Sequence, residues 1–275
     1  MGERADRRTW WAVLAVIGLV LVVRLVMILY AERENGTPAP TPVPASRPAL
    51  QARVATRTVR ETSPEYRVEL KIPELSIEGE AGALAEVNAA LAAPQLQRQQ
   101  ELRPEAVQYH QDMKERFGIE RPPFELVSDF KVTLQRPGFV SLYTDLYEYT
   151  GGAHGATTRR GATVELEQAR LLSLADLFVE GFDWNQALLG SIREQMQAQP
   201  DLYFEDAASK LSRLSAEQPY YLEPGNVVVF FAQYELAPYA AGIPEFRVPV
   251  QVLAAGLRPE VREALSSGEG GAAAH

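Results

Sequence analysis

The chain has 275 residues, of which 46% are hydrophobic and 23% charged, so it can bury a sizeable core and is neither disordered nor collagen-like. Its formal net charge of −9 disfavours a nucleic-acid partner, because phosphate binding needs clustered Lys and Arg side chains. The sequence has no cysteine, which excludes disulfides, thiolate metal sites and cysteine nucleophiles.

Residues 10–30 read WWAVLAVIGLVLVVRLVMILY and carry one charge, Arg24. A helix of this length spans the hydrocarbon layer of about 30 Å. Arg4, Arg7 and Arg8 precede it, which places the N-terminus in the cytoplasm. The sequence therefore predicts a single-pass type II protein of the cell membrane, with a cytoplasmic stub at 1–9 and a bilayer anchor at 10–30. An uncleaved anchor is favoured over a cleaved signal, and both export the rest.

The exported part is predicted to have a linker, two subdomains and a tail. Residues 31–53 form the linker, in which 35–49 contain five prolines, a composition typical of an extended spacer. We expect α+β subdomains at 54–155 and 156–265 and a flexible Gly-rich and Ala-rich tail at 266–275.

The first subdomain is predicted to begin with two strands, since apolar and polar residues alternate over 54–72. Residues 83–117 favour helix, but Pro94 and Pro104 should break or kink it. A hairpin is expected over 124–149, with its turn at residues 136–138.

The second subdomain is predicted to begin with a strand pair at about 156–170. Asp183 can cap a helix over 184–197, and another helix is expected near 204–214. Residues 220–236 should form two strands around a turn at 223–226, followed by a short strand at 246–250 and a helix around 250–265. Hairpins with helices between them favour an α+β fold, an antiparallel sheet with packed helices.

Motifs for chemistry are few. His110, His154 and His275 share no metal-ligand spacing, so no metal site, cofactor or catalytic residue is predicted. The sequence contains neither a GxSxG elbow nor a GxxxxGK[ST] loop. His110 is expected to be a structural helix residue, whereas His154 lies among glycines that permit unusual backbone angles. That loop is either a simple strand connection or a partner-contacting loop.

Three strings carry a family resemblance: YTGGAHG (149–155), LLSLADLF (171–178) and FFAQYELAPYAAGIPEF (230–246). In this order they resemble the paired domain-of-unknown-function families 4163 and 3298, over about residues 55–255. These families occur in the extracytoplasmic part of RsiV-type anti-sigma factors and in the N-terminal region of PdaC-type peptidoglycan deacetylases. The resemblance implies an α+β module of the bacterial cell envelope, which in the RsiV type binds lysozyme.

Two departures from these families limit what the resemblance implies. Only nine residues precede the apolar segment, so a sigma-binding function is not expected. Nothing after Val250 resembles a deacetylase domain. We therefore expect a membrane-tethered binding module rather than an enzyme.

The expected partner is a wall-targeting protein such as lysozyme, or the peptidoglycan glycan. Residues 35–275 carry 22 basic and 32 acidic side chains, a net charge of −10, which suits a cationic partner. The loops 149–155 and 235–242 are expected to follow antiparallel strands of one sheet and to form one exposed binding face. Its predicted loop residues are Gly151, Gly152, His154, Pro238 and Tyr239, and Tyr149 and Tyr234 are expected to support it from the strand ends.

Two alternatives stay open. One is a cell-wall-active enzyme, a glycan hydrolase or an accessory to a deacetylase, which would need Asp145, His154 and Glu235 to converge in one cleft. The other is a structural envelope protein in which these loops are folding turns.

Overall fold

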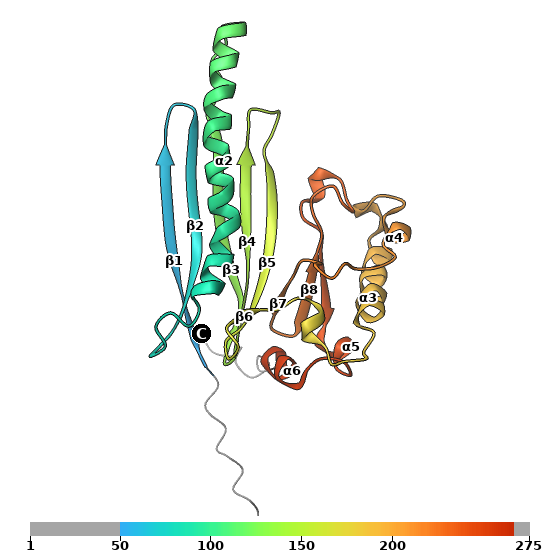
Figure 1. Cartoon of the computed structure of the whole chain (residues 1–275). Coiled ribbons are helices and arrows are strands. Elements are labelled where there is room, and N and C mark those ends of the chain that lie inside the picture. Colours follow the sequence, from blue (N-terminus) through green and yellow to red (C-terminus); the bar gives the residue numbers. More distant parts are fainter. Residues whose placement is uncertain (1–49, 267–275) are drawn as a thin grey trace, which may run out of the picture. The chain divides into compact units, whose positions relative to one another are not determined.

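The computed structural model describes residues 50–266, within which nine strands form a six-stranded and a three-stranded sheet (Figure 1). The strands of the larger sheet are β1 (Ala52–Thr62), β2 (Tyr66–Ile77), β3 (Phe124–Arg136), β4 (Phe139–Tyr149), β5 (Ala156–Glu165) and β6 (Arg170–Leu171). Those of the smaller sheet are β7 (Tyr220–Glu223), β8 (Asn226–Phe230) and β9 (Glu245–Pro249). The α-helices are α2 (Ala85–Phe117), α3 (Trp184–Ala198), α4 (Ala207–Lys210), α5 (Val250–Leu253) and α6 (Pro259–Ser266).

The predicted anchor at 10–30 lies outside the described residues, as do the linker up to residue 49 and the tail from residue 267. Within residues 50–266, no helix combines the length and the apolar character that a membrane crossing needs. The boundary expected between residues 155 and 156 falls between β4 and β5, which pair with each other in the larger sheet.

The larger sheet has the order β1-β2-β3-β4-β5-β6. All its neighbouring strands are antiparallel except β2 and β3, which run parallel from Tyr66 opposite Phe124 to Leu70 opposite Ser128. The α+β class is confirmed, but the expectation of a wholly antiparallel sheet is wrong at this pair. The helix α2 connects β2 to β3, and a long crossover of this kind returns the chain in the same direction.

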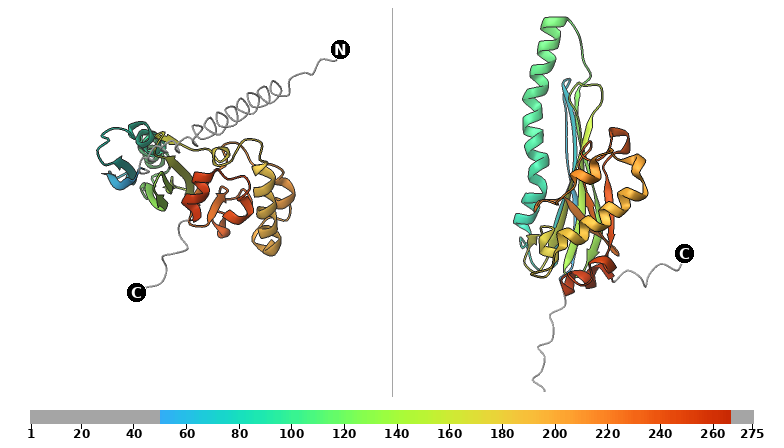
Figure 2. Two further views of the ribbon diagram at one scale, coloured as in Figure 1. Left: turned by 90° about the horizontal axis from the view of Figure 1, so that it is seen from below. Right: turned by 90° about the vertical axis from the view of Figure 1, so that its right-hand side faces the viewer.

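The helix α2 covers one face of the larger sheet, as the right-hand view of Figure 2 shows. Its contact with the sheet is a buried apolar cluster. The buried members are Val68, Leu70, Ile72, Phe124 and Leu126 from the sheet and Ala92, Leu102 and Ala106 from α2. Small side chains on the helix allow its backbone to approach the strands closely.

Pro94 and Pro104 do not break α2, contrary to expectation, because tertiary contacts hold the helix on both sides of them. Arg98 lies between the two prolines and donates from Nε and Nη2 to the Glu148 carboxylate on β4, at 2.9 and 2.6 Å. Gln95 bonds the Ser128 hydroxyl on β3. These bonds offset the main-chain hydrogen bonds that each proline removes.

The smaller sheet has the order β7-β8-β9 and contacts the larger one through β7. A Cβ on Gly161 of β5 would lie 1.9 Å from the Tyr220 carbonyl oxygen, so only glycine allows this approach. The Leu222 N–H donates to Ser141 Oγ on β4 at 2.8 Å. Side chains of β7–β9 and α3 pack together in the largest apolar core of the described residues.

Several local expectations are confirmed. The hairpin β3–β4 turns at Pro137 and Gly138, and Gly138 has a positive φ of 84°. The strands β1 and β2 form the expected first pair. Asp183 caps α3, since its carboxylate accepts the Gln186 N–H at 3.0 Å.

Three expectations for the second half are wrong. The helix near 204–214 is reduced to α4, because Arg193 and Asn185 of α3 bond the main chain at Leu211 and Leu214 and hold it non-helical. The strand expected through residue 236 ends at Phe230. The C-terminal helix is divided into α5 and α6, since Gly256 packs against the Phe182 ring between them.

Candidate binding site

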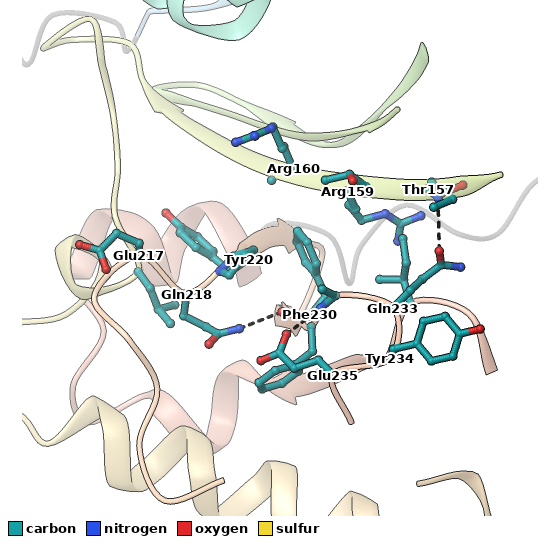
Figure 3. A pocket seen from close by; sticks show the side chains of 18 of the residues that line it. Thr157, Arg159, Arg160, Glu217, Gln218, Tyr220, Phe230, Gln233, Tyr234 and Glu235 are labelled. Carbon is teal, nitrogen blue, oxygen red and sulfur yellow. Dashed lines mark hydrogen bonds between the residues drawn. The ribbon is translucent and has the colours of Figure 1, made fainter. Parts of the chain in front are cut away.

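A cavity of about 770 Å³ lies between β5 and the chain on either side of β7 and β8 (Figure 3). One wall is residues 156–161 of β5, and the others are residues 172–174, 216–220 and 230–235. Leu172, Leu174, Phe230 and Phe231 are buried and give it apolar walls. Gln218 and Gln233 add polar groups, and the Gln218 amide donates to the Phe230 carbonyl at 2.8 Å. Such a mixture of apolar surface and few polar groups is typical of binding sites.

The two predicted loops meet at this cavity. Residues 150–155 follow β4 of the larger sheet, whereas residues 231–244 follow β8 of the smaller one. The expectation that both follow strands of one sheet is therefore wrong, because β7–β9 form a separate sheet. The loops still touch, since Tyr239 Oη donates to the Gly155 carbonyl at 3.0 Å.

Three rings at this contact form what we call the aromatic stack: His154, Tyr239 and Tyr234. The His154 and Tyr239 ring centroids are 4.4 Å apart, and those of Tyr239 and Tyr234 are 5.6 Å apart. All three residues line the cavity. His154 is exposed and Tyr234 is 55% exposed, so the stack presents aromatic surface to a partner.

The turn after β8 places Tyr234 at the surface. Its φ of 66° is in the left-handed region, which a non-glycine residue adopts at a cost of about 1–2 kcal/mol. Glu235 supports the turn, since its carboxylate accepts the Ala232 N–H at 2.9 Å. Gln233 reaches β5, where its Oε1 accepts the Thr157 N–H at 3.2 Å. Backbone strain of this kind is common at functional sites.

The glycines of the first loop have structural causes. A Cβ on Gly155 would lie 2.4 Å from Cζ of Tyr147, so a larger residue there would displace the Tyr147 ring. Gly151 has a φ of 85° and packs against the Tyr109 ring of α2. Its carbonyl accepts a hydrogen bond from Arg121 Nη2 at 2.6 Å. Gly151 therefore holds the loop to the helix side of the sheet.

The predicted binding residues are thus divided. His154, Tyr234 and Tyr239 line the cavity, whereas Gly152 and Pro238 are exposed on the same two loops outside its lining. Tyr149 ends β4 and is half-buried opposite Glu125. Gly151 and Tyr239 were expected to be exposed and are half-buried, the first against Tyr109 and the second within the aromatic stack.

Arg159 of β5 lines the cavity, but its charge is already paired. It donates from Nε and Nη2 to the Asp145 carboxylate, at 2.6 and 2.7 Å, and pairs with Glu245. Its guanidinium also lies 3.8 Å from the Tyr143 ring centroid. Burial opposes the charge, but the hydrogen bond to Asp145 and attraction to Asp145 and Glu245 outweigh it and raise the pKa of Arg159.

The catalytic alternative required Asp145, His154 and Glu235 to converge. Asp145 is held by Arg159 and is not among the residues that line the cavity. Glu235 closes its own turn, and His154 Nδ1 lies 2.9 Å from the Gly155 carbonyl oxygen. The three side chains each serve local structure and do not form a common acid-base group.

The sequence did not indicate the β5 wall or the residues before β7. Thr157, Arg159, Gln218 and Tyr220 come from segments that carry no motif for binding. Gln233 lies within the string 230–246, and only its position beside Tyr234 could have indicated it.

Comparison with known proteins gives two family matches. Residues 59–157 match the model of the family described as deacetylase PdaC, and residues 175–251 match that of a protein family of unknown function, DUF3298. The first match runs from β1 into β5, and the second from the turn after β6 into α5.

Two curated relatives come from Bacillus subtilis. The peptidoglycan-N-acetylmuramic acid deacetylase PdaC is 25% identical over 122 residues, 41% of this chain and 25% of that protein. The anti-sigma-V factor RsiV is 26% identical over 136 residues, 46% of this chain and 47% of that protein. The chain therefore spans a quarter to a half of the lengths of these relatives.

Two solved structures of DUF3298 proteins share the fold. The protein from Bacteroides fragilis has a TM-score of 0.60 at 19% identity, covering 79% of this chain and 98% of that one. The protein from Pseudomonas aeruginosa has a TM-score of 0.53 at 19% identity, covering 77% and 96%. The resemblance to RsiV-type and PdaC-type proteins is thus confirmed: a region that matches the PdaC model precedes one that matches the DUF3298 model.

Proposed function

We propose that this chain is an extracytoplasmic binding module of the bacterial cell envelope that recognises a wall-targeting protein such as lysozyme. In this proposal residues 10–30 anchor it in the cell membrane and residues 35–275 lie outside. The similarity to RsiV and to PdaC supports the envelope setting, since PdaC is by its name a deacetylase of peptidoglycan.

The observation that carries the proposal is the meeting of two loops from different sheets in one aromatic stack beside a large cavity. Tyrosine brings a large, rigid contact area at low conformational entropy cost, and it is enriched among residues that dominate binding energy. The stack is held by Tyr239, so Tyr234 is preorganised for contact.

Charge favours a cationic protein. The net charge of −10 over residues 35–275 attracts a basic partner and raises the association rate. A second candidate partner is the peptidoglycan glycan, on which the PdaC relative acts by its name. The exposed Tyr234 ring is a surface on which a sugar ring can stack.

The test measures binding of the purified full chain to lysozyme and to purified peptidoglycan, with Tyr234→Gly as the variant. Glycine fits the left-handed backbone at 234, so the fold is kept while the ring is removed. We expect affinity to fall by about 1–3 kcal/mol with no loss of thermal stability.

Phe117→Ala is the matched control, because Phe117 is an aromatic residue that is 64% exposed at the end of α2. It should leave affinity unchanged. The proposal would be contradicted if the unmodified chain bound neither lysozyme nor peptidoglycan. It would also be contradicted if Tyr234→Gly bound as tightly as the unmodified chain.

A further inference from the structure

The outer edge of β5 is open along the cavity. The strand pairs with β4 from Ala156 to Glu165, but within residues 50–266 its pairing with β6 is confined to Val164 and Glu165. Of the rest of β5, residues 156–161 form a wall of the cavity.

Three hydrogen bonds show which main-chain groups point outward. The Thr157 N–H donates to Gln233 Oε1 at 3.2 Å, and the Thr163 carbonyl accepts the Leu172 N–H at 2.8 Å, both away from β4. Leu166, in contrast, is an even-numbered residue, and its N–H donates to the Gly138 carbonyl beside β4 at 2.9 Å. The main-chain groups of odd-numbered residues therefore point away from β4 and those of even-numbered ones toward it. Because alternate residues of a strand direct both main-chain groups to the same side, those of Arg159 and Gly161 point outward.

These outward groups of Arg159 and Gly161 have no main-chain hydrogen-bond partner among the described residues. Gln233 already imitates one bond of an added strand, since its side-chain amide occupies the Thr157 N–H. Figure 3 shows this bond beside the open cavity. An edge of this kind is a template for pairing with another chain.

The two sides of this edge differ in chemistry. Figure 3 shows Arg160 leaving β5 away from Phe230, while the buried Phe230 and Leu174 lie along the cavity. Arg160 is exposed and makes no side-chain hydrogen bond or ion pair within residues 50–266, in contrast to Arg159. A strand added here presents one side chain to the apolar walls and the next to Arg160.

We propose that the edge of β5 from Thr157 to Gly161 accepts an extended peptide as an additional strand, with apolar side chains facing Phe230 and acidic ones facing Arg160. Gly161 ends the docking edge, because the Tyr220 carbonyl approaches it there. This inference goes beyond the proposed function, since it concerns main-chain pairing by β5 and not the aromatic stack.

The test is a selection of linear random peptides displayed on phage against the full chain, followed by synthesis of the selected peptides. We expect peptides with alternating apolar and acidic residues. Bound peptide should slow hydrogen exchange at the Arg159 and Gly161 amides, measured by NMR. Methylation of alternate peptide nitrogens should abolish binding in one register and leave it unchanged in the other, because one set of N–H groups faces β5.

Two variants and one control variant test the contacts that Arg160 and Gln233 would make or block. Arg160→Glu should lower the affinity for the acidic peptides by about tenfold. Arg213→Glu is the control and should leave that affinity unchanged, because Arg213 is another exposed arginine without a side-chain partner among the described residues. Gln233→Ala should strengthen binding, since it frees the Thr157 N–H.

Failure to select any peptide, protection of amides outside β5, or binding that tolerates every N-methylation would overturn the inference. Lysozyme and peptidoglycan binding are measured in parallel. If the chain binds lysozyme or peptidoglycan but no peptide, this inference alone fails. If peptides bind and neither lysozyme nor peptidoglycan does, the proposed function alone fails.

Discussion

The charged side chains that join α2 to the sheet are paired, whereas some of those that line the cavity are not. Arg98 of α2 bonds Glu148 and Glu105, and Glu61 of β1 bonds Tyr66 and Arg103. At the cavity, Arg160 and Glu217 have no side-chain partner among residues 50–266. The pairs under α2 hold the helix to the sheet, and the cavity side keeps charge and main-chain groups available to a partner.

The largest effect on stability should come from the contact between the two sheets at Gly161 of β5 and Tyr220 of β7. Gly161→Ala places a Cβ 1.9 Å from the Tyr220 carbonyl, and because that atom is backbone, β7 must shift. We expect a loss of about 3 kcal/mol in the free energy of unfolding, measured by denaturant titration. Gly190→Ala is the control, since Gly190 is in α3 with no atom near its Cβ position, and it should gain about 0.5–1 kcal/mol. Equal stability of both variants would refute the close approach.

The α2 side is tested by Arg98→Met. This variant leaves the half-buried Glu148 without its bidentate partner, and we expect a loss of about 2 kcal/mol in unfolding free energy. Arg160→Met should change stability by no more than about 0.5 kcal/mol, as at other surface positions. Equal losses from the two variants would remove the distinction between the paired Arg98 and the unpaired Arg160.

A smaller effect is expected at the aromatic stack. Tyr239→Phe removes the hydrogen bond to the Gly155 carbonyl and should cost about 1 kcal/mol of stability. Tyr234→Phe is its matched control, because the Tyr234 hydroxyl has no hydrogen-bond partner among the described residues. Thermal melts of both variants measure the difference, and a melting temperature for Tyr239→Phe equal to that of the unmodified chain would show that the bond does not hold the loops together.

The smallest effect is the contribution of Glu61 to stability at acid pH. The hydrogen bond from Tyr66, with those from Arg103 and Gln99, lowers the pKa of Glu61 below the ordinary 4.5. Its contribution to stability is therefore complete above about pH 4.5 and is lost as the pH falls through the lowered value. The effect is small because 30% of the Glu61 side chain is exposed. Glu61→Gln should flatten the stability profile between pH 5 and about 3, and an unchanged profile would argue against this role.

Local patterns predicted much of the fold. Alternation over 54–72 predicted the pair β1–β2, because each strand buries one face, and the turn at 136–138 predicted the hairpin β3–β4. The Asp183 cap predicted the start of α3. The parallel β2–β3 pair could not be predicted, since it depends on where the crossover returns the chain. The continuity of α2 through Pro94 and Pro104 depends on bonds to Ser128 and Glu148 that lie far away in the sequence.

The candidate site was predicted in part. The glycines around His154 and the aromatic residues of 230–246 indicated two loops, and the structure brings His154, Tyr239 and Tyr234 together. The β5 edge gave no signal, because its availability depends on β6 being short. Tyr239 was expected at the surface, but its hydroxyl donates to the Gly155 carbonyl of the other loop.

Hydrogen–deuterium exchange of the full chain with and without lysozyme tests whether the aromatic stack binds a partner. We expect slower exchange in residues 150–161 and 231–239, and unchanged exchange in α2 and β1. Protection confined to α2 and β1, or no protection at lysozyme concentrations that saturate binding, would contradict it.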